Sequence, residues 1–201
     1  MLDDPGAFFK HPGQANITLS DIFVFPDLRK VGNGDEKRRV FISSQRLLSP
    51  EVTADGALVE GDEKAGCTSI LYELYRQYHD RGFVPVLIHG KELRRATDAE
   101  INSAIKNAVE SQYGKGYVEA FLQLPATQKL LLIDNFDDSS MKAATARADL
   151  LCALKKRFGH MVVTTGPMFE MREMLDGDAS RQLLALQHYQ LQPFGYPILE
   201  T

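Results

Sequence analysis

The chain has few cysteines, no clustered histidines and no long apolar run. Its two cysteines, Cys67 and Cys152, are far apart and form no CxxC pair. A disulfide framework or a cysteine-based zinc site is therefore not expected, and a reduced, cytoplasmic setting fits. The five histidines lack zinc-type spacing. No apolar run reaches membrane-spanning length, and residues 1–13 lack the basic and apolar regions of a signal peptide.

A strong net charge is also lacking. The formal charge of −4 is mild and argues against a nucleic-acid-binding module, which would usually present a basic face. The hydrophobic fraction of 44% allows a sizeable core, and 201 residues suit one domain. Residues 1–50 differ from the rest and look like a lead-in segment that packs on a main domain at 51–201. In this lead-in, 22–25 is predicted as a strand or a docked extended segment and 39–42 as a strand.

From residue 57 onward, strand and helix signals alternate. Apolar runs predict strands at 57–60, 84–88, 130–133, 161–165 and 183–191. Helical spacing of apolar residues predicts helices at 68–81, 98–112, 116–124, 143–158 and 169–175. Asp98 is expected to cap its helix. Apolar strands that alternate with amphipathic helices predict a three-layer α/β/α domain around a central parallel sheet.

A candidate phosphate-binding loop lies between the first of these strands and the helix after it. It matches the pattern GxxxxGK(S/T) except at Cys67, which replaces the lysine. The glycines let the backbone approach phosphate oxygens, and the helix N-terminus supplies N–H groups for an anion. Thr68 offers a hydroxyl to Mg²⁺. The candidate binding residues are Gly61, Asp62, Glu63, Lys64, Ala65, Gly66, Cys67 and Thr68.

The missing lysine removes a positive charge from the candidate loop. Loss of a charge-assisted hydrogen bond costs about 1.5–3 kcal/mol, or roughly 10- to 150-fold in affinity. The loss should be larger in a phosphoryl-transfer transition state. Lys64 could reach inward as a substitute. The alternative interpretation is a glycine-bounded turn between a strand and a helix that binds nothing.

An acid follows the most apolar strand. Asp134 would hold Mg²⁺ through its water shell, at the strand end where such folds bind ligands. Many hydrolysing proteins of this kind have a second carboxylate next, but Asn135 stands there, and an amide is a poor general base. Asp137 or Asp138 could compensate, although Asp and Asn are also common in turns. Thr164 and Thr165 end the next strand, where a polar sensor could meet a γ-phosphate.

Together these motifs resemble the bacterial STAND-type P-loop NTPases, which have an AAA-like ATPase core and include proteins found beside or fused to calcineurin-like metallophosphoesterase domains. The similar stretches are residues 19–29, 61–68, 82–86, 131–134 and 190–195. The resemblance implies that one strand separates the loop strand from the strand ending in Asp134. It implies that Gly61 to Ser69 surround the phosphates of ATP or GTP, with Mg²⁺ at Thr68 and Asp134 and Pro193 near the base. A winged-helix lid would follow the chain, and no metallophosphoesterase motif is present.

The expected function is a nucleotide-dependent signalling switch with weak or absent hydrolysis. Its expected partners are the nucleotide, further copies of the chain in a homo-oligomer, and lid, sensor or effector domains outside it, with neither nucleic acid nor membrane involved. One alternative is a working ATPase in which Lys64 and Asp137 or Asp138 act as substitutes. Another is a pseudo-NTPase that has lost its nucleotide and serves as an assembly scaffold.

Overall fold

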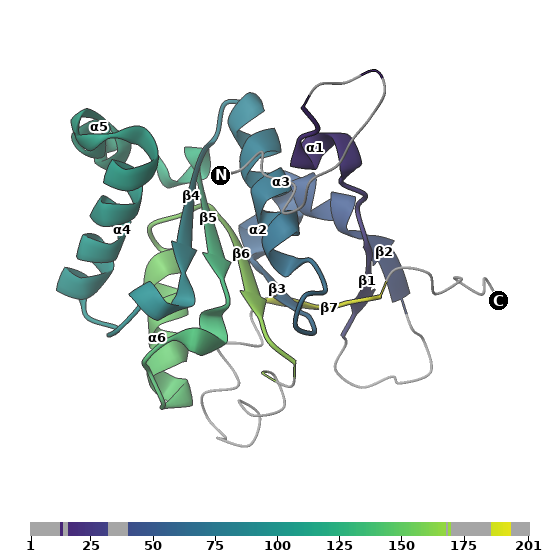
Figure 1. The fold of residues 1–201 in the computed structure, drawn as a ribbon. Helices are drawn as coiled ribbons and strands as arrows, with labels where there is room; N and C mark the ends of the chain where they lie inside the picture. The colour runs from purple at the N-terminus through teal and green to yellow at the C-terminus, as the bar shows by residue number, and fades with distance from the viewer. Residues whose placement is uncertain (1–12, 14–15, 32–39, 168, 170–185, 194–201) are drawn as a thin grey trace.

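A seven-stranded mixed sheet forms the centre of the computed structural model, which describes residues 13, 16–31, 40–167, 169 and 186–193 (Figure 1). The strands are β1 (Asp27–Lys30), β2 (Val40–Ser43), β3 (Ala57–Glu60), β4 (Val84–His89), β5 (Lys129–Asp134), β6 (His160–Thr165) and β7 (Gln187–Leu191). Their order in the sheet is β2-β1-β7-β3-β6-β5-β4. The predicted α/β fold is confirmed, because β7, β3, β6, β5 and β4 run parallel.

The lead-in segment belongs to the same sheet. Strand β1 pairs antiparallel with β2 on one side and with β7 on the other. The strand predicted at 39–42 is therefore present, shifted by one residue, but the antiparallel edge and β1 were not predicted. Of the two alternatives expected at 22–25, a strand or a docked extended segment, the docked extended segment is present at residues 23–25. Ile22 ends α1 (Leu19–Ile22), and the chain after it is extended, with Phe23 and Phe25 packed on the core.

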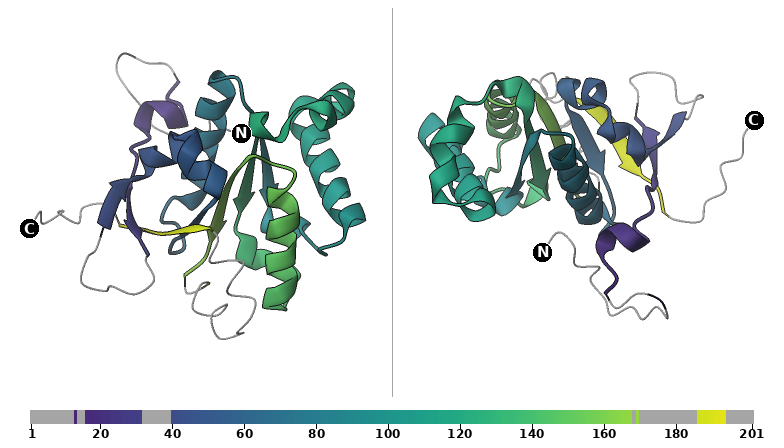
Figure 2. Two further views of the ribbon diagram at one scale, coloured as in Figure 1. Left: turned by 180° about the vertical axis from the view of Figure 1, so that it is seen from behind. Right: turned by 90° about the horizontal axis from the view of Figure 1, so that it is seen from above.

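Helices cover both faces of the sheet (Figure 2). The longer ones are α2 (Pro50–Asp55), α3 (Cys67–Asp80), α4 (Asp98–Tyr113), α5 (Val118–Gln123) and α6 (Ala144–Lys155). Short 3₁₀ segments are η1 (Ser44–Leu48), η2 (Gly90–Glu92), η3 (Lys115–Tyr117), η4 (Ala126–Gln128) and η5 (Phe136–Asp138). Neither α2 nor η1 was predicted. None of the helices in the described ranges combines the length and apolar character needed to cross a bilayer.

The sequence of strand β5 explains why a hydrophobic core forms on each face of the sheet. Its side chains alternate between the faces, so Leu131 and Ile133 pack with α4 and α6, while Leu130 and Leu132 pack with α3. All four leucine and isoleucine side chains are completely buried. A strand covered on both faces must be apolar throughout, which is why the sequence signal at 130–133 was clear.

Most predicted elements are present with small shifts at their ends. The N-cap of α4 is Thr97, not Asp98, because the Thr97 hydroxyl accepts the Glu100 N–H at 3.4 Å. The helix predicted at 116–124 begins as a 3₁₀ turn and becomes α5. The described part of the strand predicted at 183–191 is β7. The helix predicted at 169–175 lies outside the described residues except for Phe169.

Candidate functional site

The carboxyl ends of β3, β5 and β6 lie next to one another beside the start of α3, and a cavity of about 580 Å³ opens there. Segments distant in sequence contribute to its wall. The lining residues are Gly61, Asp62, Glu63, Lys64, Ala65, Gly66, Cys67, Thr68, Ser69, Asn135, Asp137, Asp138, Thr165, Gly166 and Pro167. The whole predicted loop therefore lies on one cavity with Asn135 and both candidate acids. Pro193, an exposed residue beyond β7, is not among the lining residues.

The loop folds into a tight turn that leads directly into α3. Its first amide, that of Gly61, donates to the Thr165 carbonyl at 3.1 Å, and the Ala65 amide donates to Asp62 at 3.0 Å. Gly66 then takes φ 102° and ψ 14°, a left-handed conformation that favours glycine. Lys64 is also left-handed, with φ 65°. The turn thereby directs the chain into the helix at the edge of the cavity.

The N-terminus of α3 is open toward the cavity. Gly66 is the N-cap and has no side chain to satisfy the first amides of the helix. The first intrahelical bond is the one that Ile70 donates to the Gly66 carbonyl at 3.0 Å. The amides of Cys67, Thr68 and Ser69 therefore have no intrahelical acceptor, and the helix dipole adds partial positive charge. This end of α3 is suited to an oxyanion.

Asp134, at the end of β5, is joined to α3 and β6 by hydrogen bonds. The Thr68 hydroxyl donates to its carboxylate at 3.0 Å from Oδ2 and 3.2 Å from Oδ1, and the Thr164 hydroxyl is 3.0 Å from Oδ1. Only 2% of Asp134 is exposed. These contacts bring together two of the predicted site residues that lie far apart in the sequence. The buried carboxylate is thereby held at a defined position beside the open helix end.

Cys67 does not supply the charge that a lysine would. Burial first, and then the negative charge of Asp134, raise the pKa of its thiol to about 11. The thiol is therefore neutral at neutral pH. The sulfur lies against Gly61, because a Cβ built on that glycine would be 2.5 Å from Sγ. Gly61 is thus needed for the close approach of the first turn of α3 to the end of β3.

We expect the Cys67 thiol to react slowly with disulfide reagents in a Cys152→Ser background, where it is the only cysteine. At pH 8 a thiol with a pKa of about 11 is ionised in roughly one molecule in a thousand, against roughly one in four for an ordinary cysteine. The rate should rise about tenfold per pH unit between pH 7 and pH 9.5. Stopped-flow measurements with a chromogenic disulfide would follow it, and a plateau below pH 9 would contradict the raised pKa.

All candidate substitutes for the missing groups are on the cavity wall, and two of them, Lys64 and Asp137, have other partners. Lys64 forms an ion pair with Glu63 at 3.5 Å, and both side chains are 88% exposed. Asp137 Oδ1 accepts the Gly166 amide at 2.9 Å and so fixes the turn after β6. Asn135 is exposed and left-handed, with φ 50°. Asp138 is exposed as well.

Thr164 and Thr165, both considered as a polar sensor in the sequence analysis, have different roles. Alternation along β6 directs Thr164 to Asp134, and the Thr164 hydroxyl also accepts the Asn135 amide at 3.1 Å. Thr165 lines the cavity, and only 2% of it is exposed. Its buried hydroxyl has no hydrogen-bond partner among the described residues. Such a group costs about 1–3 kcal/mol unless a ligand satisfies it.

This difference predicts opposite effects of one substitution at adjacent positions. Thr165→Val removes an unsatisfied hydroxyl, so the free energy of unfolding should stay constant or rise by up to about 1 kcal/mol. Thr164→Val removes one of the hydrogen bonds of Asp134 and leaves the Asn135 amide without its partner, so it should lower the free energy of unfolding by about 1–3 kcal/mol. Urea denaturation without ligand would measure both. Equal destabilisation by the two variants would show that Thr165 has a partner within the protein.

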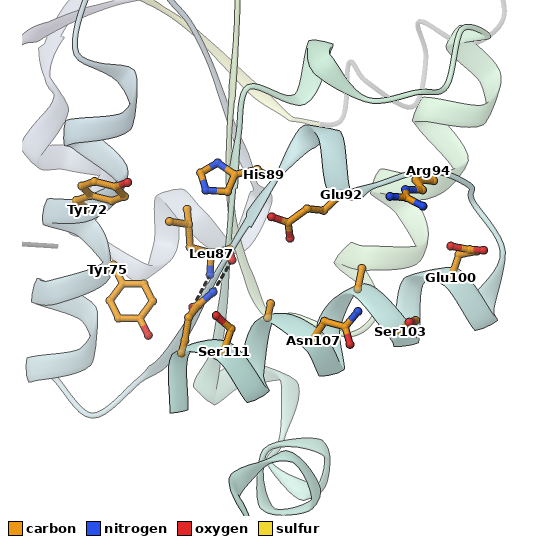
Figure 3. A pocket seen from close by; sticks show the side chains of 13 residues that line it. Tyr72, Tyr75, Leu87, His89, Glu92, Arg94, Glu100, Ser103, Asn107 and Ser111 are labelled. Atoms are coloured by element: carbon orange, nitrogen blue, oxygen red, sulfur yellow. Dashed lines mark hydrogen bonds between the residues drawn. The ribbon is translucent and has the colours of Figure 1, made fainter. Parts of the chain in front are cut away.

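His89 was not predicted from the sequence. It ends β4, directly opposite Asp134 in the register with β5, and its Nδ1 lies 3.5 Å from Asp134 Oδ2. The same ring lines a second cavity, of about 970 Å³, between α3, β4 and α4 (Figure 3). The signal in the sequence that could have identified His89 is its place as a polar residue at the carboxyl end of a predicted strand.

The oxygen donors at this site fit a magnesium ion that arrives with a phosphate ligand. Thr68 and Asp134 offer hydroxyl and carboxylate oxygens, which Mg²⁺ prefers, and Mg²⁺ usually keeps waters or phosphate oxygens as its other ligands. Across the described ranges there is no group of three or more His, Cys, Asp or Glu residues that could hold a metal. The donor set therefore suits Mg²⁺ with a phosphate compound better than a metal enclosed by the protein alone.

The chain was compared with known proteins at the level of family and of sequence. It matches no model of a known protein family, and it matches no curated protein in sequence.

Proposed function

We propose that the chain binds a purine nucleoside triphosphate with Mg²⁺ in the cavity beside α3 and acts as a nucleotide-dependent switch with weak or absent hydrolysis. The observation that carries this proposal is the pair of hydrogen bonds from the Thr68 hydroxyl to the Asp134 carboxylate, next to the uncapped N-terminus of α3. Phosphate oxygens would accept from the helix amides, and Mg²⁺ would be held by Thr68 and by water on Asp134.

Two further features support nucleotide binding. Strand β6 lies between β3 and β5, which is the arrangement that the resemblance to STAND-type P-loop NTPases implies. The unsatisfied Thr165 hydroxyl on the cavity wall is suited to donate to a phosphate oxygen. Thr165 ends β6, on the same edge of the sheet as the open end of α3.

Slow hydrolysis follows from the side chains of Cys67 and Asn135, which replace the lysine and the second carboxylate of a hydrolysing site. The neutral Cys67 thiol cannot offset the charge that develops on a transferred phosphoryl group. Asn135 has no carboxylate to take a proton from water. A working ATPase remains the second candidate, because Asp137 and Asp138 line the same cavity.

A titration of the chain with ATP and with GTP, in the presence of Mg²⁺, tests the proposal. Isothermal calorimetry should show saturable binding of at least one nucleotide below about 1 mM, and a phosphate-release assay should show no turnover above background. Release that Asp137→Asn abolishes would instead support the working ATPase. No binding of either nucleotide at millimolar concentration would overturn the proposal and leave a scaffold.

A further inference from the structure

The second cavity is a groove along the exposed edge of β4, with α3 on one side and α4 on the other (Figure 3). Tyr72 and Tyr75 of α3 form one wall. The other wall is the polar side of α4, where Ser103, Asn107 and Ser111 follow at four-residue spacing. These side chains are short, which leaves the groove open.

The edge of β4 beneath the groove is closed to an added strand. The side-chain amide of Gln112 donates to the Leu87 carbonyl at 2.6 Å and accepts the Leu87 amide at 3.1 Å. The Tyr113 hydroxyl donates to the Pro85 carbonyl at 2.7 Å. Since these backbone groups are occupied, a peptide could not pair along this edge as a strand. Strand addition is therefore excluded at these positions, and we consider a compact ligand as the occupant of the groove.

The chemistry of the groove near His89 favours a cation. In Figure 3 Glu92 extends toward the side where His89 and the two tyrosines lie. Arg94 and Glu100 lie toward the other side. The described lining therefore carries two carboxylates, Glu92 and Glu100, against one guanidinium, that of Arg94. A carboxylate opposite aromatic rings suits a cation that also has an apolar body. We propose that the groove binds an organic cation, a guanidinium or ammonium group on an aliphatic stem.

The groove and the candidate nucleotide site share His89. Its ring lines the groove, while its Nδ1 is 3.5 Å from Asp134 Oδ2. A cation bound in the groove therefore adds positive charge behind the carboxylate that would hold Mg²⁺. Repulsion between the two cations should weaken Mg²⁺ binding by about two- to fivefold. This coupling rests on the proposed function, whereas binding in the groove does not.

Butylguanidinium is a suitable probe, and butanol is its neutral control. In a titration of ¹⁵N-labelled protein followed by NMR, butylguanidinium should give saturable shifts around the groove, with a dissociation constant of about 1–10 mM for so small a ligand. Glu92→Gln should weaken binding at least threefold. Glu119→Gln, at an exposed acid on α5 that does not line the groove, is the matched control and should leave binding unchanged. Absence of saturation, equal binding of butanol, or unchanged binding to Glu92→Gln would overturn the groove proposal.

A Mg²⁺ titration in the presence and in the absence of 20 mM butylguanidinium tests the coupling. Salt is adjusted so that both samples have the same ionic strength of about 20 mM. The apparent dissociation constant for Mg²⁺, followed at the Thr68 amide, should rise about two- to fivefold with the probe, and the effect should vanish in Glu92→Gln. An unchanged constant would overturn the coupling. If Mg²⁺ alone does not bind, the coupling is overturned, while the nucleotide site is judged by its titration with Mg²⁺ and nucleotide, and the groove by its own titration.

Discussion

Replacing Asp134 by asparagine is expected to lower the affinity for Mg²⁺–nucleotide by at least about 100-fold. The amide keeps the shape of the side chain but removes the negative charge that would hold the ion. Charges around the cavity make the ion essential, since the described lining residues include four acids, Asp62, Glu63, Asp137 and Asp138, against one cation, Lys64. Calorimetry should therefore also show loss of binding to the unaltered chain when EDTA removes Mg²⁺.

Asp149→Asn is the matched control, because Asp149 is an exposed acid on α6. It should bind nucleotide as the unaltered chain does. Asp134→Asn can still accept the Thr68 and Thr164 hydroxyls, so its free energy of unfolding should change by no more than about 1–2 kcal/mol. Binding that survives in a folded Asp134→Asn variant, or binding that is unchanged in EDTA, would contradict the role of Asp134.

The central part of the fold could be predicted because its signals are local. An apolar strand buried on both faces and an amphipathic helix each leave a pattern in a few consecutive residues, as at 130–133 and in α3. The rule that parallel strands end at one edge then places the turn after β3 near Asp134. The contact between Thr68 and Asp134 follows from these two steps.

Features that depend on distant partners could not be predicted in the same way. Strand β1 is a four-residue segment, DLRK, in which only Leu28 is fully buried, and its neighbour β7 lies more than 150 residues further along the chain. The roles of Thr164 and Thr165 depend on which face of β6 meets Asp134, and two adjacent threonines do not indicate that. His89 became a site residue only through the register of β4 with β5.

Replacing Cys67 by lysine is expected to raise the affinity for nucleotide by about 10- to 150-fold. The negative charges that raise the pKa of the Cys67 thiol, chiefly that of Asp134 with smaller effects of Asp137 and Asp62, would stabilise a cation at this position. Gly61, which has no Cβ, leaves room for a side chain to pass along the end of β3. Binding without Mg²⁺, undetectable in the unaltered chain, should then become measurable. Cys67→Met adds a side chain of similar length without charge and should gain nothing. If Cys67→Lys binds no better than Cys67→Met in a calorimetric titration, the amides at the start of α3 do not hold phosphate.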